Sequence, residues 1–518
     1  MRVTNRMMID TVLRDLFNNN RRAIRLQDQI ATGRIVNNPS EDPLISDQVI
    51  GLDTRIARAV QYIRNGQAGT SFLSLADSTL GDVNDLATSA RTLAVKMAND
   101  TQSATTRSQA SGEVDQILAE VVDLANRRFR DRYIFGGHET MTVPFEITAG
   151  GDVRYNGDMA HVKVQLTENA INQVSVNGAD VFNAFDAAVT GIADLDPALD
   201  LSVDATGTRL SELNGGGGVT PGSIRIIYGG GTVADVDLTT AETVEDVATI
   251  INDATGLAVA ATAAGDALQI SGGGGPISVQ ELGGGSTARE LGILGSAAGP
   301  LLVGTDVDPA VTSHTKITSL LGGAGLDPSG FTINNGGASQ TFLPAAWNTV
   351  GDMLEALNAS GVDIYAEINP GGDGLNVYSR LNGATMTITE NGGNTAADLG
   401  ILEVAGVRAD NLFTSLMDLS ADLQANDRAG ISNAITLIDN ATDELLKTRA
   451  EIGARVQRTE AIKTRQEDEE YNLTALLSET NDLDYSRAAM DFQNLRNVMD
   501  AALSMAAQTL PRSLADFL

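Results

Sequence analysis

The sequence predicts a mainly α protein. Both chain ends form a coiled-coil or helical-bundle rod, which carries a β-rich hairpin region and an inserted, duplicated α+β outer domain. Two observations at the ends and one in the middle predict this class. Apolar residues recur at alternating spacings of three and four near each terminus, as in a coiled-coil seam. The middle is rich in Gly and Thr and repeats itself. A chain with matching helical ends is expected to leave and return at the same place.

The two terminal stripes are the predicted assembly interface. A single helix of this length is marginal in water, so each stripe needs a partner surface. Asn19 and Asp491 are polar groups within the seam, and we expect them to influence the register of pairing. The stripe near the start contains Ile9, Val12, Leu16, Asn19, Ala23, Leu26 and Ile30, and the stripe near the finish contains Asp491, Leu495, Val498, Ala502 and Met505.

The helical pattern is interrupted and then resumes. Gly33 is a natural end for the first helix, and Pro39 disfavours helix in the residue before it. Ser40 is the expected N-cap of the second helix, with Pro43 tolerated in its first turn. Short β-rich segments follow from about residue 133 to 181, with Asn177-Gly178 as a tight-turn signal. The expected domains are 1–43 with 481–518 as terminal assembly helices, and 44–186 with 410–480 as the helical rod.

Residues 187–409 form the predicted outer domain, and they contain an internal duplication. TRLSELNGGGGVTPGSIRI at 208–226 aligns without gaps on TKITSLLGGAGLDPSGFTI at 315–333. Repeats of this kind predict two tandem α+β units, at about 207–294 and 314–402. Each unit is expected to hold strands and one helix, at 243–254 in the first unit and 349–359 in the second.

The charge balance argues against nucleic acid and membrane as primary partners. The chain has 35 Lys and Arg against 67 Asp and Glu, a net charge of −32, which repels both polyanions and anionic lipid. No stretch approaches the ~20 apolar residues of a membrane span. The first helix is locally basic, but its arginines interleave with the apolar stripe. Charges flanking a seam that select a partner helix are the favoured interpretation over a nucleic-acid arm.

The sequence predicts no enzyme: catalytic, cofactor-binding and metal-binding residues are all expected to be absent. Cysteine is absent, which excludes disulfides and thiolate chemistry and suits a protein working outside the cell. The three histidines, His138, His161 and His314, are isolated in the sequence. The Gly runs lack the Lys-Ser/Thr ending of a phosphate loop, so they are interpreted as turns between strands. Asp10 and Asp15 interrupt the N-terminal stretch, which therefore does not read as a secretory signal.

Several short runs have a recognisable composition: Met1–Thr4 with Met7-Met8, Thr32–Pro43, Arg132–Gly137, Asn177–Phe182, Arg449–Arg455 and Ser513–Leu518. Together they resemble the flagellin superfamily of bacterial flagellar axial proteins, and most closely its hook–filament junction members. Filament flagellins usually have alanines where this chain has Pro39 and Pro43. The duplicated units resemble repeats in the variable domains of flagellins, hook-associated proteins and filament caps.

The resemblance implies a structural part of the flagellum, located outside the cell at the hook–filament junction. It implies export by the flagellar type III apparatus without a cleaved signal peptide. The implied partners are like copies in a ring, the first hook-associated junction protein, flagellin, an export chaperone and the export apparatus. One alternative is filament flagellin itself. A second is that the insertion at 187–409 acts as an adhesion or glycan-binding module, although it lacks the aromatic clusters usual in sugar platforms.

Overall fold

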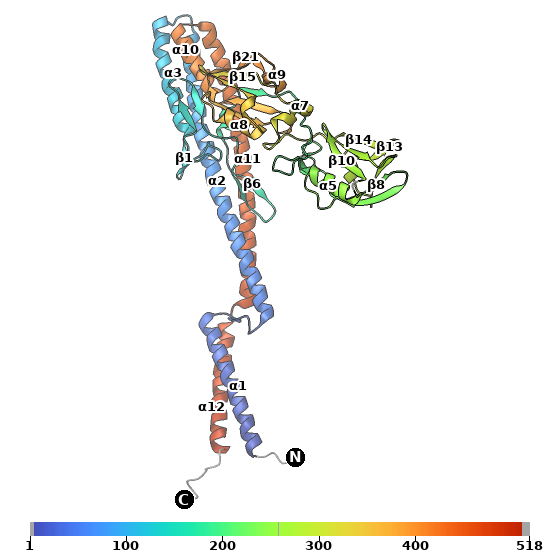
Figure 1. The fold of residues 1–518 in the computed structure, drawn as a ribbon. Helices are drawn as coiled ribbons and strands as arrows, with labels where there is room; N and C mark the ends of the chain where they lie inside the picture. Colours follow the sequence, from blue (N-terminus) through green and yellow to red (C-terminus); the bar gives the residue numbers. More distant parts are fainter. Residues whose placement is uncertain (1–4, 257, 510–518) are drawn as a thin grey trace. The chain divides into compact units, whose positions relative to one another are not determined.

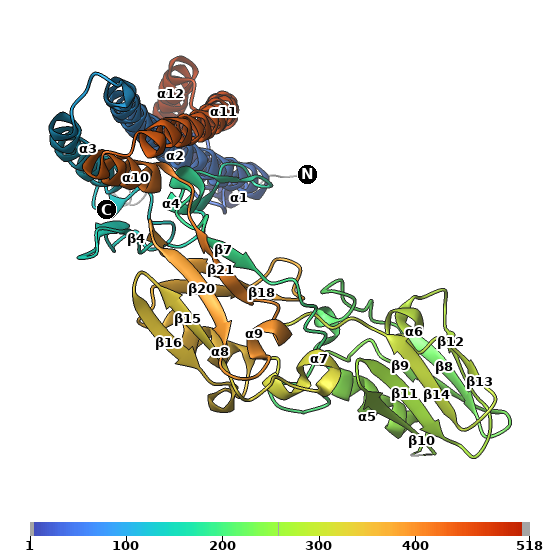
Figure 2. The same cartoon turned by 90° about the horizontal axis from the view of Figure 1, so that it is seen from above.

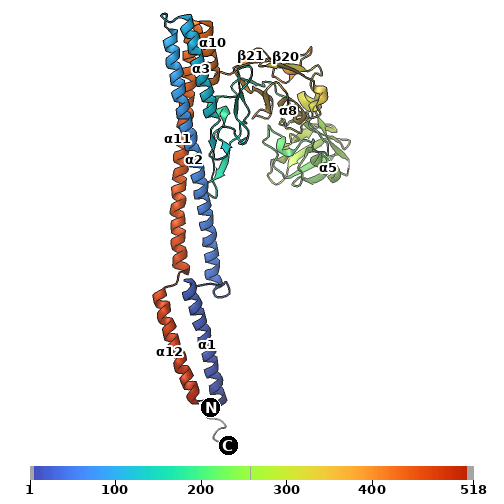
Figure 3. The same cartoon turned by 90° about the vertical axis from the view of Figure 1, so that its left-hand side faces the viewer.

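The computed structural model describes residues 5–256 and 258–509, and only the backbone for 5–10, 12 and 506–509. The chain divides into two compact units, which are described separately (Figures 1 to 3). None of the described helices is both long and apolar enough to cross a lipid bilayer. Unit 1 comprises residues 1–74, 163–174 and 453–518, and unit 2 comprises residues 75–162 and 175–452.

Unit 1 is built from helices of both chain ends and one small hairpin. Helices α1 and α12 pack against each other, as Figures 1 and 3 show. Thus the sequence prediction that the two chain ends meet as helices is confirmed. The elements are α1 (Asn5–Thr32), the first part of α2 (Pro43–Ala98), β5 (Lys163–Gln165), β6 (Ile171–Gln173), the last part of α11 (Arg428–Asn481) and α12 (Tyr485–Thr509).

Backbone hydrogen bonds tie the two breaks between these helices together. Gly33 ends α1 with a φ of +73°, a conformation that costs glycine least. Beyond it, the Ile35 amide donates to the Asn481 carbonyl at 2.7 Å. The Val36 amide donates to the side-chain oxygen of Asn481 at 2.9 Å. The end of α1 and the end of α11 are therefore fixed at one place, although 445 residues separate Val36 from Asn481.

The N-cap of α2 is not the residue predicted from the sequence. The expected N-cap was Ser40, but the helix begins at Pro43. The Asp42 side chain accepts hydrogen bonds from the amides of Leu44 and Ile45, both at 3.1 Å. Ser40 lies in the turn before the helix. Since Pro43 has no amide hydrogen and fits the first helical position, the residue directly before it provides the cap.

A buried arginine on α3 (Ala104–Ala125), Arg107, connects the end of α2 to the end of α10 (Leu412–Ala425) in the helical part of unit 2. The elements of this part are the rest of α2 and α11 with α3 and α10, which pack on each other. Arg107 is 4% exposed. Its Nε donates to the Met97 carbonyl at 2.8 Å, its Nη2 to the Asn99 carbonyl at 2.9 Å, and its Nη1 to the Asn426 side chain at 2.5 Å. Nε and Nη2 thereby satisfy carbonyls at the end of α2 and just beyond it, which have no partner within the helix.

An aromatic cluster joins α10 to the β-rich segment predicted at 133–181. Phe145 and Tyr155 pair across the hairpin, and their ring centroids are 4.9 Å apart. The Phe413 ring from α10 lies 5.1 Å from Phe145 and 5.3 Å from Phe182. The elements here are β1 (Arg128–Phe129), β2 (Arg132–Tyr133), β3 (Phe145–Ile147), β4 (Val153–Tyr155) and α4 (Gly178–Phe182).

Asn177-Gly178, predicted as a tight turn between strands, instead opens α4. The side-chain oxygen of Asn177 accepts from the Asp180 amide at 2.8 Å and caps the helix. A Cβ on Gly178 would lie 2.6 Å from atoms of both the Phe145 and Tyr155 rings. Glycine is therefore needed here for close packing against the aromatic cluster, and not for a hairpin turn.

The middle of the chain is rich in strands and runs through a similar, though not identical, order of elements twice. Both helices that the repeats predicted are present, as α5 and α8. Each is capped by a Thr whose side chain accepts from the amide of an Asp three residues on, Thr243 with Asp246 and Thr349 with Asp352. The first run holds η1 (Leu210–Glu212), β8 (Ser223–Tyr228), β9 (Thr232–Asp237), α5 (Val244–Ala254), β10 (Val259–Ala264), β11 (Ala267–Gly272), β12 (Ile277–Glu281), α6 (Thr287–Glu290), β13 (Gly295–Ala297) and β14 (Leu301–Asp306).

The second run is nested around the first. Strand β7 precedes the first run in sequence, yet it pairs with β18 of the second (Figure 2). The sheet orders are β13-β12-β8-β9 and β10-β11-β14 in the first run, and β16-β15-β20-β21 and β17-β18-β7 in the second. The bounds are β7 (Ala188–Thr190), η2 (Ile317–Ser319), α7 (Leu320–Gly323), β15 (Phe331–Asn335), β16 (Ala338–Phe342), η3 (Pro344–Ala346), α8 (Val350–Asn358), β17 (Ile364–Ile368), β18 (Leu375–Ser379), β19 (Leu381–Asn382), β20 (Thr385–Glu390), α9 (Thr395–Asp398) and β21 (Glu403–Arg408).

Two similar linkers join the runs, LDPAL at 195–199 and VDPAV at 307–311. Each linker bonds to the 3₁₀ segment of one run and to the β-turns of both. The Ala198 amide donates to Ser319, and the Ala310 amide donates to Glu212, both at 2.7 Å. At the turns, Leu199 donates to Gly265 at 2.8 Å. This exchange of contacts gives the junction between the two runs an approximate twofold symmetry.

Candidate assembly surface

The stripe predicted on α1 lies on the side of the helix that is partly shielded from solvent. Leu16, Asn19, Ala23, Leu26 and Ile30 are all half-buried. The side chains of Ile9 and Val12 lie outside the described part of the chain. The five described members are therefore brought together on one face. Their role in assembly stays a prediction.

The stripe predicted on α12 is divided between two faces. Leu495 and Ala502 are half-buried, but Asp491 is exposed, and Val498 and Met505 are 53% and 63% exposed. The residues that are shielded from solvent on α12 also follow a three-four spacing, but two of them, Phe492 and Met499, lie one position after the predicted Asp491 and Val498. The shielded residues are Ala488, Phe492, Leu495, Met499 and Ala502.

The terminal helices also present apolar side chains to solvent. On α1, Leu13, Phe17 and Ile24 are 47%, 62% and 51% exposed. On α12, Met490 and Leu503 are 61% and 50% exposed, in addition to Val498 and Met505. Apolar residues on two faces of a helix indicate more than one packing partner. We did not predict the second face of α1 from the sequence, although Leu13, Phe17 and Ile24 also follow a three-four spacing.

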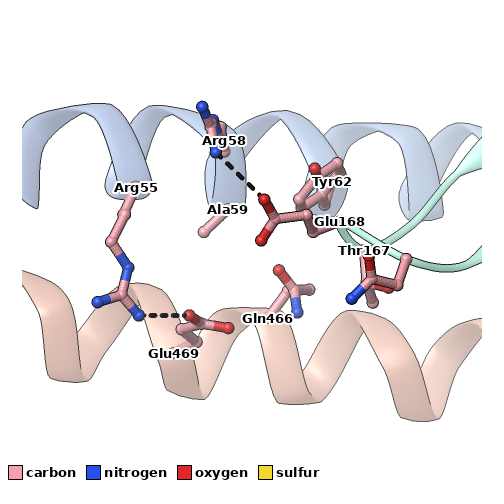
Figure 4. A pocket seen from close by; sticks show the side chains of 9 residues that line it. Arg55, Arg58, Ala59, Tyr62, Thr167, Glu168, Gln466 and Glu469 are labelled. Carbon is pink, nitrogen blue, oxygen red and sulfur yellow. Dashed lines mark hydrogen bonds and ion pairs between the residues drawn. The ribbon is translucent and has the colours of Figure 1, made fainter. Parts of the chain in front are cut away.

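A polar cavity of about 210 Å³ lies between α2, α11 and the β5–β6 turn in unit 1 (Figure 4). Two ion pairs cross its lining: Arg55 to Glu469 at 3.3 Å, and Arg58 to Glu168 at 3.6 Å. All four side chains are at least 45% exposed, so these pairs add little stability. The lining also includes Ala59, Tyr62, Thr167, Asn169 and Gln466. It holds neither histidine nor a paired nucleophile and base, so its geometry suggests no reaction.

The histidines do not form a joint site. His138 and His161 do come together, because the His138 ring lies 3.3 Å from the His161 carbonyl. His161 Nε2 also lies 3.4 Å from a carboxylate oxygen of Asp180. His314 is exposed. Among the described residues, its one hydrogen bond is the one that its backbone amide donates to the Thr312 hydroxyl. Two histidines and one carboxylate in this arrangement fit a local polar contact.

Aspartates gather at the junction between the two runs of the middle segment. Asp196, Asp266 and Asp306 bring carboxylate oxygens within 4.8 Å of one another. Burial and the nearby carboxylates raise the pKa of Asp196 to about 6, and Asp194 and Asp308 add to the effect. Like charges held this close repel, and an acidic cluster alone is no evidence for a bound cation. The junction therefore carries an electrostatic cost at neutral pH.

This cost predicts a pH-dependent stability. Because the pKa of Asp196 is higher in the folded chain than its ordinary value of 3.8, the folded state takes up the proton first. Stability from this group should rise as the pH falls from 7.5 to 5, and should be lost again as the pH rises through 6. Asp196→Asn should raise the thermal midpoint more at pH 7.5 than at pH 5, because protonation of the carboxyl in the folded chain relieves part of the cost at pH 5. An equal shift at both pH values would contradict this, and Asp204→Asn, at an exposed position, is the matched control.

Comparison with known proteins matches both helical ends. Residues 3–140 match the bacterial flagellin N-terminal helical region, and residues 435–518 match the bacterial flagellin C-terminal helical region. Flagellar hook-associated protein 3 of Salmonella typhimurium is 29% identical over 185 residues, which are 36% of this chain and 57% of that protein. The Escherichia coli protein of the same name is 28% identical over the same shares. The chain thus spans 57% of the length of these relatives.

Other similarities are more distant. A flagellin of Clostridium tyrobutyricum is 28% identical over 129 residues, covering 24% of this chain and 33% of that one. The crystal structure of flagellar hook-associated protein 3 from Legionella pneumophila aligns with a TM-score of 0.37 and 14% identity, over 83% of this chain and 97% of that chain. The two ends of the chain are therefore similar to the N-terminal and C-terminal helical regions of bacterial flagellins.

Proposed function

We propose that the protein is a non-enzymatic structural part of the bacterial flagellum, an axial adaptor that joins a hook-associated protein to the flagellin filament. It assembles through its terminal helices. The matched regions cover both of those helices, and the two curated relatives of 28–29% identity carry the name hook-associated protein 3.

The observation that carries this proposal is the exposed apolar surface of α1 and α12. Phe17 on α1 and Met505 on α12 are each more than 60% exposed in the single chain. Apolar side chains of this size cost free energy in water, about 25 cal/mol for each Å² of apolar surface. Packing against helices of neighbouring subunits removes that surface from water. An axial assembly supplies such neighbours to every copy.

We assign the chain's segments to roles within this assembly. Residues 1–43 and 481–518 form the assembly helices, and 44–186 with 410–480 form the supporting helical region. Residues 187–409 form an outer domain derived by duplication, with repeats at about 207–294 and 314–402. The shared element order and the matching capping boxes at Thr243 and Thr349 support the duplication.

The partners in this proposal follow from the place of an adaptor in the flagellum. They are like copies in a ring, the first hook-associated junction protein on one side and flagellin on the other. An export chaperone and the flagellar export apparatus would deliver the chain to its extracellular position.

Deletion of the gene tests the junction role against that of filament flagellin. Loss of a junction adaptor should leave hooks without filaments, while flagellin accumulates in the medium. Loss of the filament subunit itself would leave no such subunit in the medium. Normal filaments on the deletion strain would contradict both assignments. Restoration of filaments by the full chain on a plasmid is the control.

A further inference from the structure

Charge is strongly segregated along the chain. Residues 1–34 carry seven Arg and three Asp, a net charge of +4, whereas the whole chain carries −32. The remaining residues therefore sum to −36. Copies of so acidic a protein repel one another unless opposite charges meet at their contact. The first helix provides the positive charge for such a contact.

The basic surface is on α1. Arg21, Arg22 and Arg25 are exposed, and we call them the basic stripe. Arg21 donates to the side chain of Asn18 at 2.8 Å. Among the described residues, the structure records no ion pair for any of the three arginines. The stripe lies on the helix that also exposes Phe17 and Ile24.

The acidic surface lies on α2 and α11 of the same unit. No Lys or Arg occurs from residue 35 to 54, or from 466 to 486, while these two stretches hold eleven acidic residues. The ion pair between Arg55 and Glu469 shows that the stretches adjoin (Figure 4). The exposed acidic residues of these stretches that lie within α2 and α11, and for which the described structure records no ion pair, form the acidic collar: Asp47, Asp53, Glu467, Asp468 and Glu479.

We propose that the basic stripe of one copy docks on the acidic collar of a second copy of this chain. The charges are complementary, and both surfaces are exposed in the single chain. The three guanidiniums of the stripe and the five carboxylates of the collar can form hydrogen-bonded ion pairs across the contact. A second copy of this chain is the favoured occupant, because one chain carries both halves of the contact.

The contact has a direction, which sets the form of the assembly. The basic stripe and the acidic collar are different surfaces, so the interface between two copies is heterologous. A pair of copies joined in this way still has one unoccupied stripe and one unoccupied collar. Interfaces of this kind generate rings or helical arrays and not closed dimers. The inference rests on the proposed axial role and adds to it the surface that orients neighbouring subunits.

Single cysteines test the contact cleanly, since the chain has none of its own. Full-length Arg22→Cys and Asp468→Cys copies are produced together in a strain lacking the native gene, and isolated flagella are oxidised mildly. A disulfide-linked dimer of the two copies is expected. The control pair, Arg22→Cys with Asp123→Cys on the exposed side of α3, should give no dimer. Equal yields from the two pairs would overturn the inference.

Charge reversal provides a second, independent measurement. Changing the three arginines of the stripe to Glu should lower incorporation into flagella about tenfold, because like charges then meet. Changing Glu467 and Asp468 to Arg should also lower it, and the combined variant should recover. If the combined variant fails while wild type incorporates, the stripe has another partner and the inference is wrong. If wild-type protein is absent from flagella, the proposed function itself fails.

Discussion

Phe145→Ala should lower the free energy of unfolding of unit 2 by about 3–5 kcal/mol, because it empties the centre of the aromatic cluster. Phe145 is 1% exposed and its ring contacts those of Tyr155, Phe182 and Phe413. The neighbouring rings come from separate elements, so they cannot readily close around the cavity. Denaturant unfolding of the full chain, followed by aromatic circular dichroism, measures the change.

The matched control is Phe17→Ala, the same substitution at a residue that is 62% exposed. Its effect on the free energy of unfolding should stay within about 0.5 kcal/mol. Comparable losses for the two variants would show that the aromatic cluster does not hold unit 2 together.

Leu16→Asp or Leu495→Asp should reduce assembly about a hundredfold and leave unit 2 folded. Both leucines are half-buried on the paired terminal helices. Placing a carboxylate in an apolar contact costs about 3 kcal/mol, which corresponds to that loss in association. Incorporation into flagella in a deletion strain measures assembly, and the thermal unfolding of purified protein checks the fold.

Asn20→Asp adds the same charge to an exposed position of α1 and is the control for this pair. The Asn20→Asp variant should be incorporated into flagella at close to the wild-type level. Normal filament growth with Leu16→Asp would show that the terminal helices do not form the assembly interface. A collapsed unit 2 in either variant would mean that the residue acts in folding and not in assembly.

Helix positions could be predicted from sequence because periodicity and breakers act locally. The helices predicted at the two chain ends, at 243–254 and at 349–359 are present as α1, α12, α5 and α8, and Gly33 ends α1. The phase of a stripe is harder to predict. On α12, Leu495 and Ala502 fit both a stripe with Val498 and one with Phe492, and only packing against α1 selects the second in this chain.

Features formed by distant segments could not be predicted in the same way. Asn177-Gly178 has the composition of a tight turn, and its helix-capping role depends on Phe145 and Tyr155 packing against Gly178. The crossing of β7 into the sheet of the second run requires pairing over nearly 190 residues, as Ala188 with Tyr378 shows. The polar cavity likewise joins residues of three separate segments.

Immunogold electron microscopy of flagella that carry epitope-tagged protein tests the junction assignment most directly. The tag would be inserted in the β8–β9 turn at Gly230, where no atom beyond the adjacent residues lies within 4 Å of an added Cβ. A junction adaptor should give label in a single band where hook meets filament. Label along the whole filament, or none on the flagellum, would contradict it.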